Sequence, residues 1–113
     1  MRHKTPGWLE NIRAACEFIM EATDGKTLKD YQSDLKLRYS VERCFLIIGE
    51  AAGRISRFDP DIASRIGDCS RIISFRNVLI HGYDIVDENI VWMVILEHLP
   101  TLKSQVEEIL NEG

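Results

Sequence analysis

Apolar residues recur at three- and four-residue intervals along almost the whole chain, and this period restricts the fold more than any other feature of the sequence. It runs from about residue 6 to 23, from about 33 to 57, from about 69 to 81, and from about 88 to the end. Because a helix repeats every 3.6 residues, each stretch predicts a helix with one apolar face. No stretch alternates at a period of two for long enough to predict a strand.

Capping and turn residues separate these stretches. Side chains that suit a helix start precede the expected helices, and Thr27 with Asp30 resembles a capping box that opens a short helix to about residue 32. The other starts are expected at Thr5-Pro6, at Ser33 for the long helix, at Asp59-Pro60 for a short helix over 60–66, and at Asp87. Pro100 predicts a break near residues 96–99 because proline lacks an N–H and clashes with the preceding turn.

These helices predict an all-α fold, an antiparallel four-helix bundle with additional short helices. A length of 113 residues suits one domain over 1–113, and 45% apolar residues are enough for one core. Small side chains interrupt the long helix, which would let another helix come close at Gly49, Ala51, Ala52 and Gly53. Gly82 can adopt the left-handed backbone that ends helices, so the helix before it should stop at His81 or Gly82.

Charge is distributed unevenly along the chain. The net charge is −4, which excludes a polycation that coats duplex phosphates. Residues 54–76 nevertheless hold five arginines against three aspartates, while residues 84–113 hold one lysine against seven acidic residues. A local site for an anionic ligand is therefore plausible beside the alternative of solvated helix faces.

The cysteines predict neither a disulfide framework nor a metal site. Cys16, Cys44 and Cys69 are odd in number and widely spaced, which is typical of buried thiols in a reducing compartment. No CxxC or HxxxH spacing occurs, and we expect no metal and no cofactor. No apolar run approaches the length of a membrane span or of a signal peptide, so we expect a soluble, cytoplasmic protein.

The segment over residues 76–83 concentrates the polar chemistry of the chain. Asn77 and His81 lie four positions apart and share a helix face, and Arg76 is long enough to reach the same ligand from the side. Arginine binds phosphate as a fork, and histidine is a general acid or base near neutral pH. Tyr83 follows Gly82 and could fold back toward the helix end. This set suits a phosphodiester substrate.

Each of these residues also has a purely structural explanation. Arg76 could pair with Asp68, Asp84 or Glu50. Asn77 could bond to the backbone, His81 could simply end a helix, and Tyr83 could pack. Glu50 and Arg54 are one turn apart, so they form an exposed ion pair or lie near the active site. Three charged residues are candidates for contacts with a substrate or a second chain: Glu50, Arg54 and Arg71.

The spacing Arg76-x4-His81-x-Tyr83 resembles the R-x4-6-H-x-Y motif of HEPN domains, with Asn77 directly after the arginine. The wider pattern resembles the HepT-like branch, the toxin half of HepT–MntA type toxin–antitoxin pairs. The segments that carry this likeness are Val41 to Ala52 (VERCFLIIGEAA), Arg76 to Asp84 (RNVLIHGYD), Val91-Trp92 and Leu99-Pro100. The resemblance covers nearly the whole chain.

The resemblance implies a homodimer that cleaves RNA as a metal-independent endoribonuclease. Arg76 would stabilise the scissile phosphate, His81 would be the acid or base, Asn77 would position substrate, and Tyr83 would contact it. It also implies a partner, an MntA-like nucleotidyltransferase antitoxin that attaches AMP to Tyr83. In-line cleavage needs a base and an acid on opposite sides of the phosphate, so we expect a composite site from two chains.

Two other functions fit the same residues. The chain could be a non-catalytic nucleotide- or RNA-binding HEPN module that partners a nucleotidyltransferase, or a plain helical dimerisation domain. The complete set of Arg76, His81 and Tyr83 favours the enzyme, since binding alone does not require an imidazole.

Overall fold

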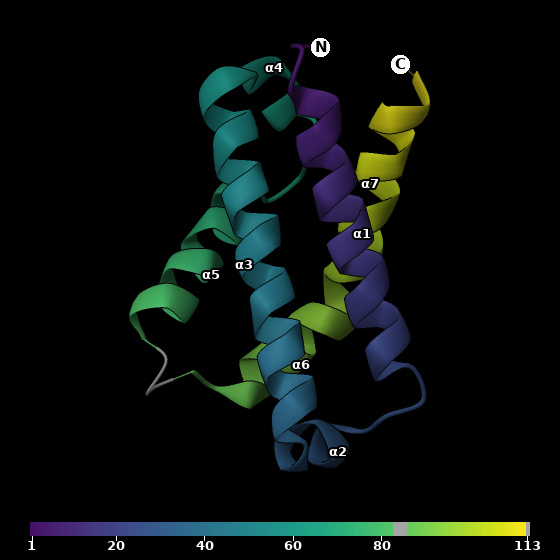
Figure 1. Ribbon diagram of the computed structural model, residues 1–113, viewed down its shortest axis with the longest axis vertical. Helices are drawn as coiled ribbons and strands as arrows, with labels where there is room; N and C mark the ends of the chain where they lie inside the picture. Colours follow the sequence, from purple (N-terminus) through teal and green to yellow (C-terminus); the bar gives the residue numbers. More distant parts are fainter. Residues whose placement is uncertain (83–85, 113) are drawn as a thin grey trace.

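The protein is described here by a computed structural model that covers residues 1–82 and 86–112. Within these residues the chain forms helices joined by short connections, and no strand (Figure 1). The helices are α1 (Thr5–Thr23), α2 (Leu28–Ser33), α3 (Leu35–Phe58), α4 (Pro60–Ala63), α5 (Cys69–His81), α6 (Glu88–Glu97) and α7 (Leu99–Glu112).

The long helices alternate in direction, as expected for an antiparallel bundle. In Figure 1, α1 and α5 run downward, while α3 and the α6–α7 pair run upward. Helix α3 packs against both α1 and α5, and α1 also packs against α7. The prediction of an all-α bundle with four main helices and short additional ones is confirmed. None of the described helices combines the length and the apolar character needed to cross a bilayer.

The core follows the apolar faces that the sequence predicted. Its fully buried side chains come from α1, α3 and α7 above all, among them Leu9, Ile12, Ile19, Ile48, Ile55, Val106 and Ile109. Helix α2 adds one anchor, Tyr31, whose ring lies 5.5 Å from that of Trp92 on α6. Trp92 is therefore a core residue in this chain.

The structure confirms some of the predicted helix caps and corrects others. The Thr27–Asp30 capping box forms at the start of α2, and the Asp87 side chain accepts a hydrogen bond from the Asn89 backbone N–H. Ser33 does not cap the long helix; it ends α2, and the Asp34 carboxylate accepts from the Leu37 backbone N–H instead, at 3.1 Å.

The cap prediction at the first helix was also wrong. Lys4 occupies the cap position, and Thr5 is the first residue of α1. The Thr5 hydroxyl is buried and donates to the carboxylate of Asp59, 2.7 Å away. Asp59 also accepts from the Arg2 backbone N–H at 2.8 Å and makes no side-chain cap to α4. These two bonds fix the start of α1 to the end of α3.

The breaks between helices also follow the sequence in part. The predicted break before Pro100 is present, because α6 ends at Glu97 and α7 begins at Leu99. The short helix expected over 60–66 is shorter, ending at Ala63. Helix α5 ends at His81 as predicted, but Gly82 is not left-handed, with φ −123°.

Candidate active site on helix α5

Helix α5 carries the segment with the polar chemistry, and it is held mainly by α3. It starts after Asp68, a non-glycine residue with left-handed backbone (φ 60°). Among its side chains only Leu79 is buried, while Ile72, Ile73 and Phe75 are half-buried. Most of the α5 surface is therefore open to solvent, including the turn that bears His81.

Arg76 lies on the side of α5 that faces α3. Its side chain is half-buried and its aliphatic stem passes directly over Gly49. Its Nε atom is buried and finds no acceptor within the described part of the chain. Two of the predicted partners of Arg76 pair elsewhere, Glu50 with Arg54 and Asp68 with Arg71, and the third, Asp84, lies outside the described residues. The guanidinium is thus seated by packing against α3.

Asn77 and His81 occupy the outer face of α5. They are one turn apart, share one face, and are both exposed. Arg76 is about 100° around the helix from Asn77. One chain therefore presents a guanidinium at the α3 border of α5 and an amide and an imidazole beside it on open surface. Tyr83, the remaining residue of the motif, lies outside the described residues.

The two charged candidates on α3 pair with each other. Arg54 Nη2 lies 3.1 Å from Glu50 Oε1, and both side chains are more than half exposed. Together with Trp8 they line a hollow of about 200 Å³ between α1 and α3. The predicted exposed ion pair is confirmed, while a role for either residue in substrate binding stays a prediction.

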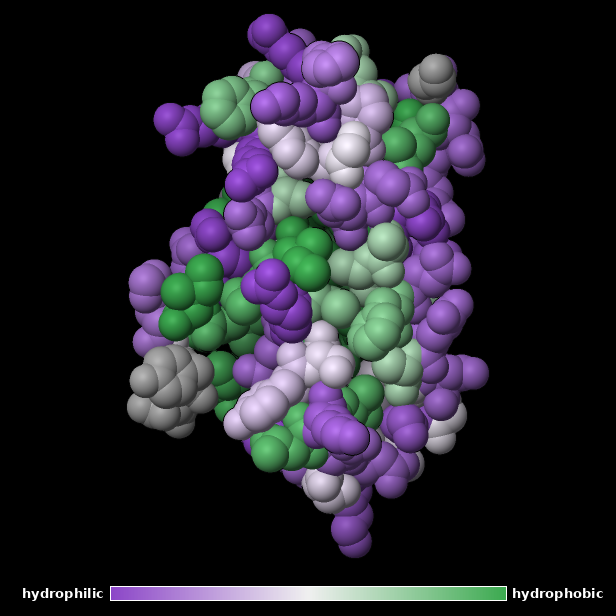
Figure 2. Space-filling view, viewed as in Figure 1, coloured by the Kyte–Doolittle hydropathy of each residue, from purple (hydrophilic) through white to green (hydrophobic). Residues whose placement is uncertain are grey.

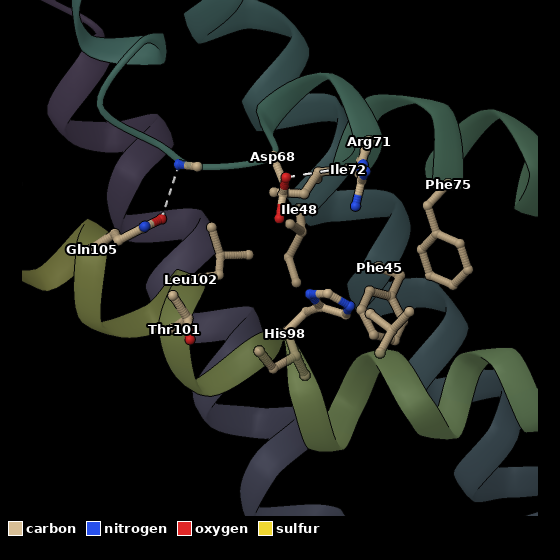
Figure 3. Close-up of a pocket in the computed structure, with 13 residues that line it drawn as sticks. Phe45, Ile48, Asp68, Arg71, Ile72, Phe75, His98, Thr101, Leu102 and Gln105 are labelled. Atoms are coloured by element: carbon tan, nitrogen blue, oxygen red, sulfur yellow. Dashed lines mark hydrogen bonds and ion pairs between the residues drawn. The ribbon is translucent and has the colours of Figure 1, made fainter.

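A second cavity, of about 410 Å³, lies between α5, α3 and the α6–α7 junction (Figure 3). Apolar side chains make up most of its wall, including Phe45, Ile48, Phe75 and Leu102. Four polar side chains also line it: Asp68, Arg71, His98 and Gln105. Arg76, Asn77 and His81 do not line it, so the cavity and the motif are separate features.

Arg71 belongs to this cavity and not to the motif. Its Nε lies 4.0 Å from Asp68 Oδ1, and in Figure 3 it points toward His98 across the opening. The sequence analysis missed His98 and Gln105. The sequence signal for His98 is weak, namely its place directly before Leu99-Pro100. The sequence offers none for Gln105, whose side chain accepts from the Gly67 backbone N–H at 3.0 Å, a contact between residues far apart in the chain.

The cysteines are poor candidates for a nucleophile. Burial raises the pKa of the Cys16 thiol to about 12, and it also raises the pKa of Cys44 and Cys69. All three are free thiols. Among the described residues no group of three or more histidine, cysteine or acidic side chains is arranged to hold a metal ion.

Comparison with known proteins decides the family. The sequence model described as Ribonuclease HepT-like matches residues 12–109. The chain belongs to the HepT-like ribonuclease family. The match spans every long helix of the bundle and includes the motif on α5.

Individual relatives of the HepT-like family agree over nearly their full length. A protein of Caldanaerobacter subterraneus subsp. tengcongensis named "Putative RNase" is 36% identical over 110 residues, covering 96% of this chain and 97% of the relative. The "Probable ribonuclease HepT" of Thermococcus cleftensis is 33% identical over 113 residues, covering 96% of this chain and 98% of the relative. No solved structure matches the chain significantly.

Proposed function

We propose that the protein is an endoribonuclease whose active site is built from the α5 motif of two chains. The observation that carries this proposal is the presentation of Asn77 and His81 on open surface beside a seated Arg76, in a chain of the HepT-like ribonuclease family. A deep pocket is not required, because an RNA strand can lie across a surface groove between two subunits.

The proposed reaction is an internal transesterification and needs no metal ion. One His81 accepts the proton of a ribose 2′-hydroxyl, whose oxygen attacks the adjacent phosphorus. The bond from phosphorus to the 5′-oxygen breaks, and the His81 of the second chain donates a proton to that leaving oxygen. The products are a 2′,3′-cyclic phosphate and a 5′-hydroxyl. Arg76 stabilises the charge that builds up on the phosphate oxygens, and Asn77 positions the strand.

Exposed apolar side chains support the homodimer. Val78 and Ile80 are 51% and 43% exposed, and they lie on α5, the helix that carries the motif. Ile90, Met93 and Leu96 on α6 are exposed as well. Figure 2 shows apolar surface over α5 beside α3. Contact between two copies through this region would cover these side chains and bring the two motifs together.

Control by a second protein completes the proposal. An MntA-like nucleotidyltransferase antitoxin would join AMP to Tyr83: the phenol oxygen attacks the α-phosphorus of ATP and pyrophosphate leaves. The added phosphate would place negative charge next to the motif and repel the RNA backbone. An RNA substrate and three free cysteines support action in the cytoplasm.

Expression in a bacterial host tests the proposal directly. We expect growth arrest and RNA cleavage with the wild-type chain, and relief of both by Arg76→Ala or His81→Ala. Coexpression of the adjacent nucleotidyltransferase, where one is encoded, should relieve the arrest and add the mass of AMP to Tyr83. A chain that binds RNA or nucleotide but neither arrests growth nor cleaves RNA would be the non-catalytic module, and the nuclease proposal would be wrong.

The composite site has a test of its own. Mixed dimers of wild-type and His81→Ala chains contain one imidazole per dimer. If two histidines act on one phosphate, these dimers should have almost no activity. Full activity per remaining histidine would show that each chain works alone.

A further inference from the structure

At Gly49, helix α3 lies directly against the Arg76 position of α5, with no room for a side chain between them. A Cβ atom placed on Gly49 would lie 2.2 Å from the Arg76 Cβ and 2.4 Å from its Cγ, and 3.5 Å from its Cα. A Cβ atom in a real protein essentially never lies within 3.0 Å of an atom to which it is not bonded through the chain. The nearest atoms sit at the root of the arginine side chain, so a rotation of the side chain alone cannot relieve the clash.

Gly53, one turn later in the same helix, shows that this crowding is local. A Cβ at Gly53 would meet nothing within 4 Å. Glycine is unfavourable inside a helix because its backbone loses more freedom on folding than that of any other residue. At Gly49 the structure provides a steric reason for that choice, whereas at Gly53 it provides none.

Two further contacts fix the position of α5 on either side of Gly49. The Cys69 thiol approaches the Ala52 backbone carbonyl at 3.9 Å, and Phe75 packs edge-on against Phe45 with ring centroids 5.1 Å apart. Phe45, Gly49 and Ala52 are spaced by four and three residues, so they share the face of α3 that meets α5. Together they set both the distance and the rotation of α5, and Gly49 sets the distance at Arg76.

Packing against Gly49 holds the Arg76 side chain in place, and its Nε–H has no hydrogen-bond partner in the described part of the chain. The Nε atom is also buried. Because the Nε–H is covered, a phosphate oxygen would bind the outer Nη groups of this half-buried side chain through charge-assisted hydrogen bonds.

We infer that Gly49 is a positioning residue for substrate binding: it lets α5 lie close enough to α3 to hold the Arg76 guanidinium where its outer nitrogens can bind a phosphodiester. The expected effect on kcat rests on the proposed nuclease function. The effect on phosphate binding by Arg76 does not, and it can be measured in a protein that does not cleave RNA.

The kinetic test compares two substitutions that are chemically identical. Gly49→Ala should lower kcat about 100-fold, because a displacement of about 1 Å at a reacting centre can cost that factor. KM should change much less, since most of the strand is bound by other groups. Gly53→Ala should leave both constants unchanged. Equal effects of the two substitutions would overturn the inference.

A double substitution separates positioning from general damage. If Gly49 acts through its contact with Arg76, then adding Gly49→Ala to an Arg76→Gly chain should lower kcat no further, because Arg76→Gly removes the Cβ that the new methyl group would meet. An additional loss of similar size in the double variant would show that Gly49 acts independently of Arg76, and the inference would be wrong. Thermal unfolding of each variant checks that it is folded.

A measurement without catalysis keeps the two proposals distinct. We expect the NMR signal of the Arg76 Nε–H to shift on addition of inorganic phosphate or of a 2′-O-methyl oligoribonucleotide, which cannot be cleaved. The shift should persist in Gly53→Ala and be lost in Gly49→Ala. A shift in a protein that does not cut RNA would support the positioning role and refute the nuclease. No shift in the wild-type protein would overturn the inference, even if Gly49→Ala failed to fold.

Discussion

Helices α1 and α5 both pack against α3, but they bury very different shares of their side chains. Helix α1 has 19 residues and buries seven of them, and it contacts α7 as well as α3. Helix α5 has 13 residues and buries only Leu79. The two helices thus have different tasks in the same bundle: α1 completes the core, while α5 displays its residues.

This difference explains where the functional groups can lie. The buried face of α1 must be apolar to fill the core, so it cannot present polar side chains to a ligand. On α5 the exposed face can carry Asn77 and His81 without any cost in packing, and the α3-facing side still anchors Arg76 at Gly49. A helix with so few buried side chains is also expected to open more readily than the helices of the core.

The largest effect should come from the imidazole on α5. His81→Ala is expected to lower RNA cleavage by about 10²- to 10⁴-fold, the usual contribution of a general acid or base. Because His81 is exposed, the midpoint of thermal unfolding should hardly change. His98→Ala is the matched control: this histidine lies at the cavity and should leave cleavage intact. Comparable losses in both variants would contradict the assignment of the site to α5.

The next effect concerns stability and compares the two helices directly. Ile12→Ala in α1 should reduce the free energy of unfolding by about 2–5 kcal/mol, because Ile12 is completely buried and its loss leaves a cavity. Ile73→Ala in α5 removes the same atoms from a half-buried site and should cost about 1 kcal/mol. Urea unfolding at one protein concentration measures both. Equal costs would show that α5 is as much a part of the core as α1.

A smaller effect is expected at the proposed dimer contact. Val78→Asp should raise the dissociation constant of the dimer by about 10- to 100-fold, since a carboxylate would be placed in an apolar contact. Sedimentation measures the change, and cleavage should recover at higher protein concentration. Phe18→Asp on α1, where the native side chain is 49% exposed, should leave the dimer unchanged. Dissociation by Phe18→Asp alone would move the contact from α5 to α1.

The smallest effect concerns the fixed start of α1. Hydrogen bonds from the Arg2 backbone N–H and the Thr5 hydroxyl lower the pKa of Asp59. A carboxylate whose pKa is lower in the folded state stabilises the protein above its unfolded pKa of about 3.9, and this contribution is lost as the pH falls through the folded value. Asp59→Asn should therefore flatten the loss of stability in acid, as followed by urea unfolding from about pH 6 to pH 3. An unchanged acid profile would mean that other carboxylates set it.

Much of the fold could be predicted because it depends on neighbours in the sequence. The apolar period located the long helices, Pro100 located the break between α6 and α7, and Thr27 with Asp30 located the start of α2. Thr5 and Ser33 are both suitable caps by residue type, but another residue decided the outcome at each helix. At α3 the neighbouring Asp34 supplies the cap in place of Ser33. At α1 the Thr5 hydroxyl donates to the buried carboxylate of Asp59 instead of capping the helix.

The sequence by itself determined that four polar groups share one short segment, that Asn77 and His81 lie on one helix face, and that small residues on α3 allow a close neighbour. Only the tertiary structure decided that Arg76 rests on Gly49 and that His98 and Arg71 line a separate cavity. The physical reason is the separation in sequence over which each interaction acts. Helix period and capping act over three or four residues, whereas the distance between α3 and α5 results from contacts between residues more than fifteen positions apart.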